Sequence, residues 1–148
     1  DKDGTSTPRI TAPPGDYHIV LRHRNHLGVM TAQPIALGAS EVTIDLSDPI
    51  VPLHGTEAMR DVNGVRVQWM GDSSHDGELK YTGNDNDRDV ILQRIGGIVP
   101  TATVVGYHAA DTNMDGISKY TGTLNDRDPI LVNIGGTVPT NTRVEQVP

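Results

Sequence analysis

Apolar and polar residues alternate in several short stretches of the first half of the chain, which is the pattern of half-buried β-strands. Asn25-His26 separates the first two stretches and is expected to form the turn between them. Four or five short antiparallel strands at this spacing predict a small β-sandwich-like part over residues 1–68. The stretches that carry the pattern are residues 17–24, 27–32, 41–46 and 65–69.

The second half contains two apolar stripes with the spacing of short helices. Ile130, Leu131 and Ile134 would share one face of a helix of two to three turns. Asn125 is its expected N-cap, and Gly135-Gly136 its expected C-terminal cap with positive φ. The other stripe predicts an equivalent helix from the same types of residue, which are Asn86, Ile91, Leu92, Ile95 and Gly96-Gly97.

The two helical stripes belong to the two copies of an internal sequence repeat. Residues 72–103 and 111–142 are identical at 20 of 32 positions, at a constant offset of 39 residues. The repeats extend over about 70–107 and 109–146. Two copies are too few for a solenoid or a propeller, so a paired arrangement is expected.

A hexapeptide at the head of each unit has the spacing of a calcium-binding loop. EF-hand loops place oxygen side chains at positions 1, 3 and 5 and glycine at position 6, because calcium takes six to eight oxygen ligands. Gly77 and Gly116 would allow the turn that brings the next carbonyl, that of Glu78 or Ile117, onto the ion. The expected side-chain ligands are Asp72, Ser74, Asp76, Asp111, Asn113 and Asp115.

The acid that closes each loop must come later than in a standard loop of twelve residues. Position 12 is occupied by Gly83 or Gly122, which has no side-chain ligand. We expect Asp89 and Asp128 to close the loops, because an acid three residues beyond the helix N-cap fits EF-hand geometry. Asp87 and Asp126 would then be additional ligands or accept hydrogen bonds from nearby backbone. The sequence thus predicts two Ca²⁺ ions per chain.

Composition and charge agree with this prediction. With no Phe, one Trp and four Tyr, the 148-residue chain must pack mainly through Val, Ile and Leu, and Tyr81 and Tyr120 are expected to help fill the core. A net charge of −7 argues against nucleic acid as a partner and suits a divalent cation. No apolar run approaches 18 residues, so no membrane span is expected. The absence of Cys excludes disulfides and thiolate metal sites.

The repeats resemble dockerin type I repeats, in which paired Asp-x-Asn-x-Asp-Gly loops each lead into one helix. They are more similar still to a C-terminal region of very large exported proteins of Bacteroidota-like bacteria. There Asn-Asp-Arg-Asp and Gly-Gly-x-Val-Pro-Thr recur, after a segment like residues 22–29. This second resemblance covers about residues 13–148 and implies calcium binding and an extracellular or cell-surface location. The insertion between Gly77 and Asp87 distinguishes the chain from dockerin type I, so cohesin recognition is not implied.

Other candidate chemistry is weaker. His18, His23 and His26, near Arg22 and Arg24, could indicate a zinc site or an anion pocket. No acid or Cys completes a metal-binding set there, so we interpret these residues as a solvated strand face and turn. The chain has neither a Gly-x-Ser-x-Gly nucleophile motif nor a phosphate-binding glycine loop, and we expect no enzyme.

The predicted fold is mainly β with short helices, in which the sandwich-like part precedes a duplicated, EF-hand-like (dockerin-like) calcium part at 69–148. We expect the two parts to pack together, because each has too little apolar content alone. The expected function is that of a calcium-stabilised structural or adhesive module of an exported bacterial protein, processed so that it starts at Asp1. The alternative is a calcium-dependent docking module for a partner protein.

Assembly with copies of itself is a further hypothesis. Residues 5–12 can run extended, and Pro13-Pro14 separates them from the first strand. An exposed sheet edge can accept a strand from another chain. Head-to-tail donation of residues 5–12 would build rings or filaments.

Overall fold

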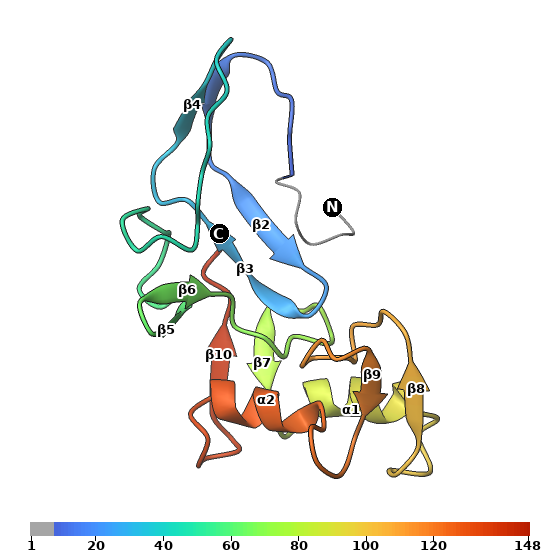
Figure 1. Ribbon diagram of the computed structural model, residues 1–148. Helices are drawn as coiled ribbons and strands as arrows, with labels where there is room; N and C mark the ends of the chain where they lie inside the picture. The colour runs from blue at the N-terminus through green and yellow to red at the C-terminus, as the bar shows by residue number, and fades with distance from the viewer. Residues whose placement is uncertain (1–7) are drawn as a thin grey trace.

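The computed structural model describes residues 8–148, which fold into a mainly β structure with ten short strands and two helices (Figure 1). All strands are three to five residues long. They pair as five separate two-stranded antiparallel sheets within the described residues. Neither helix is long and apolar enough to cross a membrane in this part of the chain.

Three of the five sheets lie in the N-terminal part. Strand β1 (Gly15–Tyr17) pairs with β4 (Ile35–Leu37), and β2 (Val20–His23) pairs with β3 (His26–Met30). The third pair is β5 (Arg60–Val62) with β6 (Val65–Val67). The predicted hairpin around Asn25 is confirmed, but its turn lies at Arg24-Asn25 instead of Asn25-His26, because His26 begins β3 and pairs with His23.

The predicted β-sandwich is wrong for residues 8–68, because no two sheets of sufficient size form there. Prolines at 34, 49 and 52 interrupt the chain, and a two-stranded ladder cannot bury a sheet face against another sheet. The predicted strand at residues 41–46 is also absent from the structure. Asp45 instead accepts hydrogen bonds from the backbone N–H and hydroxyl of Ser47, which turns the chain before Pro49.

Both predicted helices are present in the repeats, as α1 (Asp87–Arg94) and α2 (Arg127–Asn133). Asn86 is the N-cap of α1 and accepts the backbone N–H of Asp89. Asn125 accepts the N–H groups of Arg127 and Asp128, although regular helix begins only after Asp126. Both glycine pairs after the helices have positive φ, as predicted.

The repeats are joined by strands that cross between the copies. Strand β7 (Glu78–Lys80) of the first copy pairs with β10 (Thr142–Val144) at the end of the second. Strand β8 (Thr103–Val105) at the end of the first copy pairs with β9 (Ile117–Lys119) of the second. Thr142 faces Lys80 as Thr103 faces Lys119, so the pairings are equivalent at the 39-residue offset. The two copies therefore form a pseudo-twofold pair, and neither completes its sheet alone.

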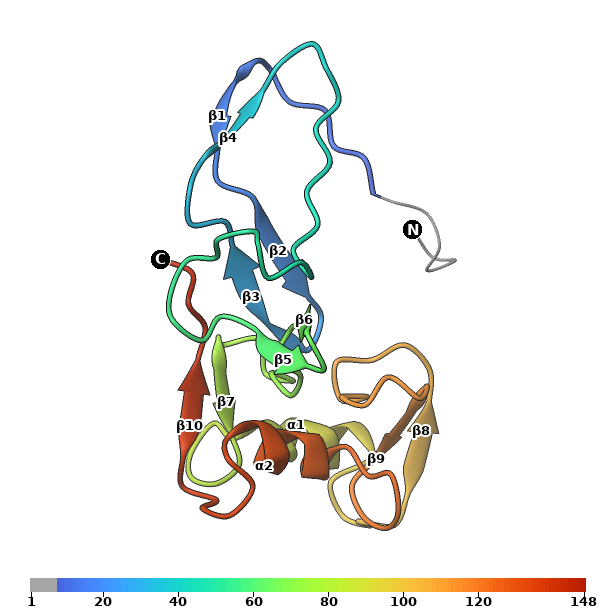
Figure 2. The ribbon, with the colours of Figure 1, turned by 60° about the vertical axis from the view of Figure 1, so that its left-hand side comes forward.

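The two crossing sheets flank the helices on opposite sides, and both ribbon views show this arrangement (Figure 2). Ile91 and Ile130 are fully buried with Ala110 between the copies, and Tyr81 and Tyr120 pack against this cluster, as predicted. Leu27 of the β2–β3 hairpin joins Leu79 and Ile134 in a second cluster. The N-terminal hairpin therefore packs directly on the repeats, as expected from their low apolar content.

Candidate metal sites in the two repeated loops

In the first loop, the carboxylate of Asp72 lies inside the turn and accepts backbone hydrogen bonds. Its Oδ1 accepts the N–H of Asp76 at 3.2 Å, and its Oδ2 accepts the N–H of Gly77 at 3.2 Å. His75 and Gly77 have positive φ, which bends the chain around the carboxylate. Burial raises the pKa of Asp72, and the nearby Asp76 adds to the rise. Both oxygens of this acid are thus hydrogen-bonded.

The second loop has the same turn but leaves one carboxylate oxygen unpartnered. Asp111 accepts the N–H of Gly116 at Oδ2, 3.1 Å away, whereas its Oδ1 is buried without a hydrogen-bond partner. The N–H of Asp115, which would correspond to that of Asp76, donates instead to Oδ1 of Asn113 at 2.9 Å. The side chain of Asp111 is only 2 % exposed. Oδ1 of Asp111 is the buried carboxylate oxygen without a hydrogen-bond partner in the described residues, and a buried polar atom of this kind requires a partner.

The acids at position 5 make local turns. Asp76 Oδ1 accepts the N–H of Glu78, and Asp115 Oδ1 accepts the N–H of Ile117, both at 2.9 Å. Glu78 and Ile117, whose carbonyls are predicted ligands, begin strands β7 and β9. Both position-5 acids therefore keep unused lone pairs beside the loop.

A buried aspartate that follows each loop accepts hydrogen bonds from backbone N–H groups at both ends of the loop. Asp87 Oδ1 accepts the N–H groups of Ser73 and Ser74 at 2.8 and 3.1 Å, and Oδ2 accepts the N–H of Lys80 at 2.8 Å. These bonds span the whole turn from the head of the loop to strand β7. The second copy repeats them, since Asp126 accepts from Thr112, Asn113 and Lys119 at 2.7, 3.2 and 2.6 Å.

These two carboxyls carry the largest acid pKa shifts in the described part. Burial raises the pKa of both Asp87 and Asp126 to about 6, and the backbone donors only partly offset this effect. The charge of Asp72 raises the pKa of Asp87 further, and that of Asp111 does the same for Asp126. The carboxylates of each copy therefore repel one another, and a cation between them would relieve the repulsion.

Asp89 and Asp128, which we expected to close the loops, lie at the helix caps. Asp89 Oδ2 accepts the side-chain N–H of Asn86 at 2.9 Å, and Asp128 Oδ2 accepts that of Asn125 at 2.8 Å. Each pair forms a reciprocal capping arrangement. The structure thus brings Asp87 and Asp126, rather than Asp89 and Asp128, against the loop backbone. The alternative role expected for Asp87 and Asp126, as acceptors of backbone hydrogen bonds, is the one observed.

The donor set of the loops is rich in oxygen but poor in converging carboxylates. No group of three or more His, Cys, Asp or Glu side chains within residues 8–148 lies close enough to hold a metal ion. Amide and backbone carbonyl oxygens would have to complete each site, and calcium accepts both. In the second loop the expected oxygens are Oδ1 of Asn113, which also accepts the N–H of Asp115, and the carbonyl of Ile117, in addition to the unpartnered oxygen of Asp111. The residues of the second loop therefore fit a hard cation better than those of the first.

Two residues important for the second loop were missed by the sequence analysis. Arg24 and Asn25, interpreted as part of a solvated turn, insert into the repeats. Asn25 is fully buried, and its side chain donates to the carbonyls of Ala109 and Asp111. Arg24 approaches Asp111 with its guanidinium. The only sequence signal for this role was that residues 22–29 belong to the stretch shared with the exported proteins.

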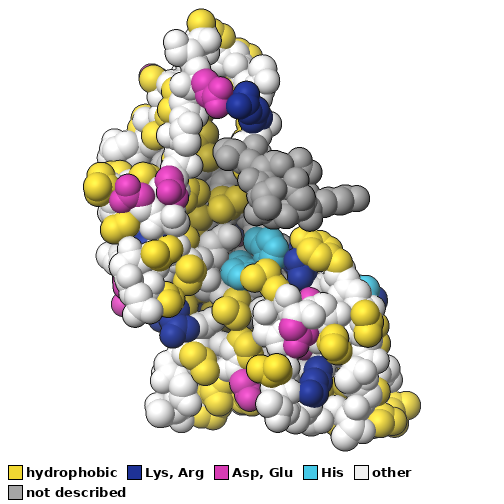
Figure 3. Space-filling model, viewed as in Figure 1, with side chains coloured by type: hydrophobic (Ala, Val, Ile, Leu, Met, Phe, Trp, Pro, Cys, Tyr) yellow, Lys and Arg dark blue, Asp and Glu magenta, His cyan; other side chains and the backbone are white. Residues whose placement is uncertain are grey.

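The two histidines of the same hairpin, His23 and His26, have lowered pKa values. Burial is the main factor that lowers the pKa of His26, to about 4, and His23 and Arg24 lower it further. Burial and Arg24 also lower the pKa of His23. Oδ1 of Asn25 lies 3.1 Å from Nδ1 of His23 and 2.8 Å from Nδ1 of His26. Histidine side chains lie at the surface in the middle of the face drawn in Figure 3, beside a basic side chain. Arg24 is thus the charged group that this turn presents to the second loop.

No family model, no curated protein and no solved structure matches the chain.

Proposed function

We propose that the chain is a non-enzymatic, calcium-stabilised structural or adhesive module of an extracellular bacterial protein, with one Ca²⁺ site in each repeated loop. The observation that carries this proposal is the buried Oδ1 of Asp111, which has no hydrogen-bond partner at the head of the loop. Loss of a partner for such a group costs about 1–3 kcal/mol, and more for a charged one. A cation at this oxygen removes that cost.

In the second loop, some side chains would bind the ion directly, and Asp126 would hold the loop backbone in place. Asp111 and Asn113 would bind it in the second loop, with Asp115 and the carbonyl of Ile117. Asp126 would act from behind, by holding three backbone N–H groups that fix the loop and by adding negative charge. When bound, the ion supplies the positive charge that lets these buried carboxylates stay ionised together.

In the first loop, the ion would be bound by Asp72, Ser74, Asp76 and the carbonyl of Glu78. Asp87 would hold the loop backbone, as Asp126 does in the second loop. Strands β7 and β9 follow the two loops directly, and each pairs with the last strand of the other copy. An ion that fixes one loop therefore also fixes a strand pairing between the copies. This arrangement makes calcium a structural part of the fold.

The modest number of free carboxylates supports an extracellular location. Many lone pairs of the loop acids are already used by backbone N–H groups, so we expect weak binding. Extracellular calcium modules have dissociation constants of roughly 10⁻⁴–10⁻³ M, which suits such sites. Cytosolic calcium is too low to fill them.

Strand addition between copies remains part of the proposal. All five sheets of the described residues have only two strands, although the second edge of β3 is partly covered by bridges from residues 53–54 and 69–71. Of the proposed donor segment 5–12, residues 5–7 lie outside the described part, and residues 8–12 carry no helix or strand. Electron microscopy of the full chain and of a variant lacking residues 1–12 tests the idea. Polymers from the full chain alone would support donation by this segment, and polymers from both would contradict it.

Thermal unfolding with and without calcium tests the main proposal. Saturation at 100 times the dissociation constant stabilises the folded state by about 2.7 kcal/mol per ion. We expect a chelator to lower the melting temperature, and calcium to restore it while equal magnesium does not. Equal melting temperatures in calcium and in chelator would contradict the proposal.

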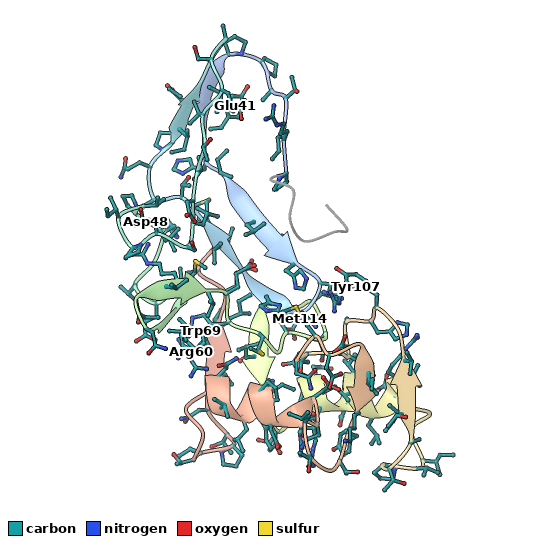
Figure 4. The ribbon with its side chains drawn as sticks, viewed as in Figure 1. Glu41, Asp48, Arg60, Trp69, Tyr107 and Met114 are labelled. Carbon is teal, nitrogen blue, oxygen red and sulfur yellow. The ribbon has the colours of Figure 1, made fainter. Side chains whose placement is uncertain are left out.

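A second candidate function, calcium-dependent docking of a partner protein, is favoured by apolar residues exposed near the second loop. Leu124 is 72 % exposed and Val132 is 53 % exposed, and both line a shallow hollow of about 400 Å³ beside α2. Met114, in the loop itself, is also exposed (Figure 4). Capture of one secreted protein in calcium but not in chelator, lost in Leu124→Ser, would support this function.

A further inference from the structure

We propose that Arg24 is a built-in counter-cation for the second loop, which neutralises Asp111 in the absence of calcium and weakens calcium binding when the ion is present. The inference rests on the proposed function for its calcium part only. It concerns how one site is regulated by a residue from the N-terminal hairpin, more than 80 positions earlier in the chain.

Arg24 is held in place by contacts on every side. Its Nε donates to the carbonyl of His108 at 3.0 Å, and its Nη2 lies 3.4 Å from Oδ2 of Asp111. Its guanidinium stacks over the ring of Tyr107, with 3.5 Å from Cζ to the ring centroid. Tyr107 lies beside the tip of the β2–β3 hairpin in Figure 4. The side chain is only 15 % exposed, so its charge is poorly screened by water.

Asp111 presents one oxygen to Arg24, while its other oxygen is buried without a hydrogen-bond partner. Oδ2 interacts with Arg24 and with the N–H of Gly116, whereas Oδ1 has no partner. The same carboxylate can therefore carry a guanidinium on one oxygen while the other is available to an ion. The guanidinium of Arg24 and a Ca²⁺ ion would both interact with the single negative charge of Asp111 and would repel each other, so each weakens the binding of the other.

The first loop has no such arrangement. No ion pair to Asp72 occurs within residues 8–148, where the ion pairs of Arg and Lys involve Glu41, Asp111, Glu57 and Glu145. The carbonyl of His108, which accepts from Arg24, corresponds to that of Trp69 in the first copy, which accepts the backbone N–H of Leu27 instead. The hairpin contacts both copies, but Arg24 reaches the first acid of the second loop only, which makes the two sites unequal.

Two consequences follow for the molecule. Without calcium, Arg24 keeps the buried Asp111 compensated, so the second copy stays folded. With calcium, the retained guanidinium repels the ion and lowers the affinity of the second loop. The N-terminal hairpin therefore sets the calcium concentration at which the second loop fills.

The test compares Arg24→Gln with Arg9→Gln, which removes the same charge from the N-terminal part. Arg9 is 81 % exposed and pairs with the exposed Glu41, far from the loops (Figure 4). We expect Arg24→Gln to tighten calcium binding at the second loop by roughly tenfold and to leave the first loop unchanged, because removal of a nearby positive charge favours a divalent cation. Arg9→Gln should change neither affinity by more than about twofold, because its charge is exposed and screened.

Arg24→Lys separates charge from packing, since it keeps the charge but loses the planar fork. It should bind calcium like the unaltered protein. If Arg24→Lys tightens the second site as much as Arg24→Gln does, or if neither does, the counter-cation inference is wrong. Site-specific affinities can be read from NMR signals of Gly77 and Gly116 during a calcium titration.

A measurement in chelator tests the inference without calcium binding. We expect Arg24→Gln to melt at least about 5 °C below Arg9→Gln, because only Arg24→Gln leaves a buried carboxylate unpaired. Adding Asp111→Asn to Arg24→Gln should recover most of that loss. Equal melting temperatures of Arg24→Gln and Arg9→Gln in chelator would overturn the inference, even if calcium binds. Failure of the proposed function would appear separately, as no calcium binding by any variant.

Discussion

The two repeated loops have the same backbone but differ in how the first acid is satisfied. Asp72 receives a backbone N–H at each oxygen, whereas Asp111 keeps a buried oxygen without a partner. The cause is one residue, because Asn113 takes the N–H that would otherwise reach Asp111, and Ser74 does not do so in the first copy. The features that the two loops share stabilise the fold. The different hydrogen bonds of Asp72 and Asp111 determine which carboxylate oxygens are available to bind an ion.

The buried aspartates behind the loops are the feature that the two copies share most closely. Asp87→Ala or Asp126→Ala would leave three backbone N–H groups without their acceptor. We expect each to lower the free energy of unfolding by roughly 3 kcal/mol or more, since each buried unsatisfied group costs about 1–3 kcal/mol. Urea denaturation measures the loss.

Asp89→Ala and Asp128→Ala are the matched controls. They remove only the partner of the capping asparagine, for which a loss of about 1 kcal/mol is expected. A larger loss for Asp128→Ala than for Asp126→Ala would show that the loops depend on the capping acids, as the sequence first indicated.

The same two aspartates should titrate alike in chelator, near pH 6, because burial raises the pKa of each to about 6. A folded-state pKa above the unfolded value means that the folded protein binds the proton more tightly. The stability from this binding is fully present below about pH 4 and is lost as the pH rises through about 6. Calcium should lower both midpoints, because it favours the ionised form.

This titration has to be resolved by residue, with carboxyl NMR signals. The pKa of His26 is lowered to about 4, so its contribution to stability has the opposite sign and is lost as the pH falls below 6.5. A global melting curve would mix the two effects. Midpoints of both aspartates near pH 4 in chelator would contradict the account of a repelling carboxylate cluster.

Strands β7 and β9 differ at their central residue, which is buried in both copies. Leu79 fills the core, whereas Ser118 carries a buried hydroxyl without a hydrogen-bond partner. Ser118→Ala should therefore raise the free energy of unfolding by about 1 kcal/mol, since it removes an unsatisfied polar group. Leu79→Ala is the contrasting change and should lower it. Destabilisation by Ser118→Ala would indicate a partner for that hydroxyl.

Exchanging the residue at position 3 should convert one loop into the other. Ser74→Asn would take the N–H of Asp76 from Asp72 and free an oxygen for the ion, which should tighten the first site. Asn113→Ser would return the N–H of Asp115 to Asp111 and weaken the second. We expect changes of a few-fold, in the range of one hydrogen bond of about 1 kcal/mol. Calcium titration of the two variants tests this, and changes of the same sign in both would contradict it.

The repeats were easier to predict from the sequence than the N-terminal part. Local signals fix α1 and α2, since the Asn caps, the apolar stripes and the glycine pairs all lie within one segment. Strands β7 and β9 were missed because their partners lie in the other copy, and pairing across the copies leaves no local pattern. The strand expected at 41–46 alternates correctly but has no partner. Alternation alone therefore does not make a strand.

The turns of the two loops were predicted from the sequence, since Gly77 and Gly116 have the positive φ that position 6 requires. The ligands assigned to positions 1, 3 and 5 from spacing stay a prediction. The choice between Asp87 and Asp89 was not decidable from spacing, since both lie in the first turn of α1. Their different surroundings depend on Ser73 and Asn86, which the fold brings to them. Arg24 could not be assigned, because its contact with Asp111 joins segments far apart in the sequence.

Isothermal titration calorimetry of chelator-stripped protein with calcium tests the central claim most directly. The account predicts two ions per chain, one lost in Asp72→Asn and the other lost in Asp111→Asn, with each single variant retaining one site. No calcium binding, or binding that survives both substitutions together, would contradict it.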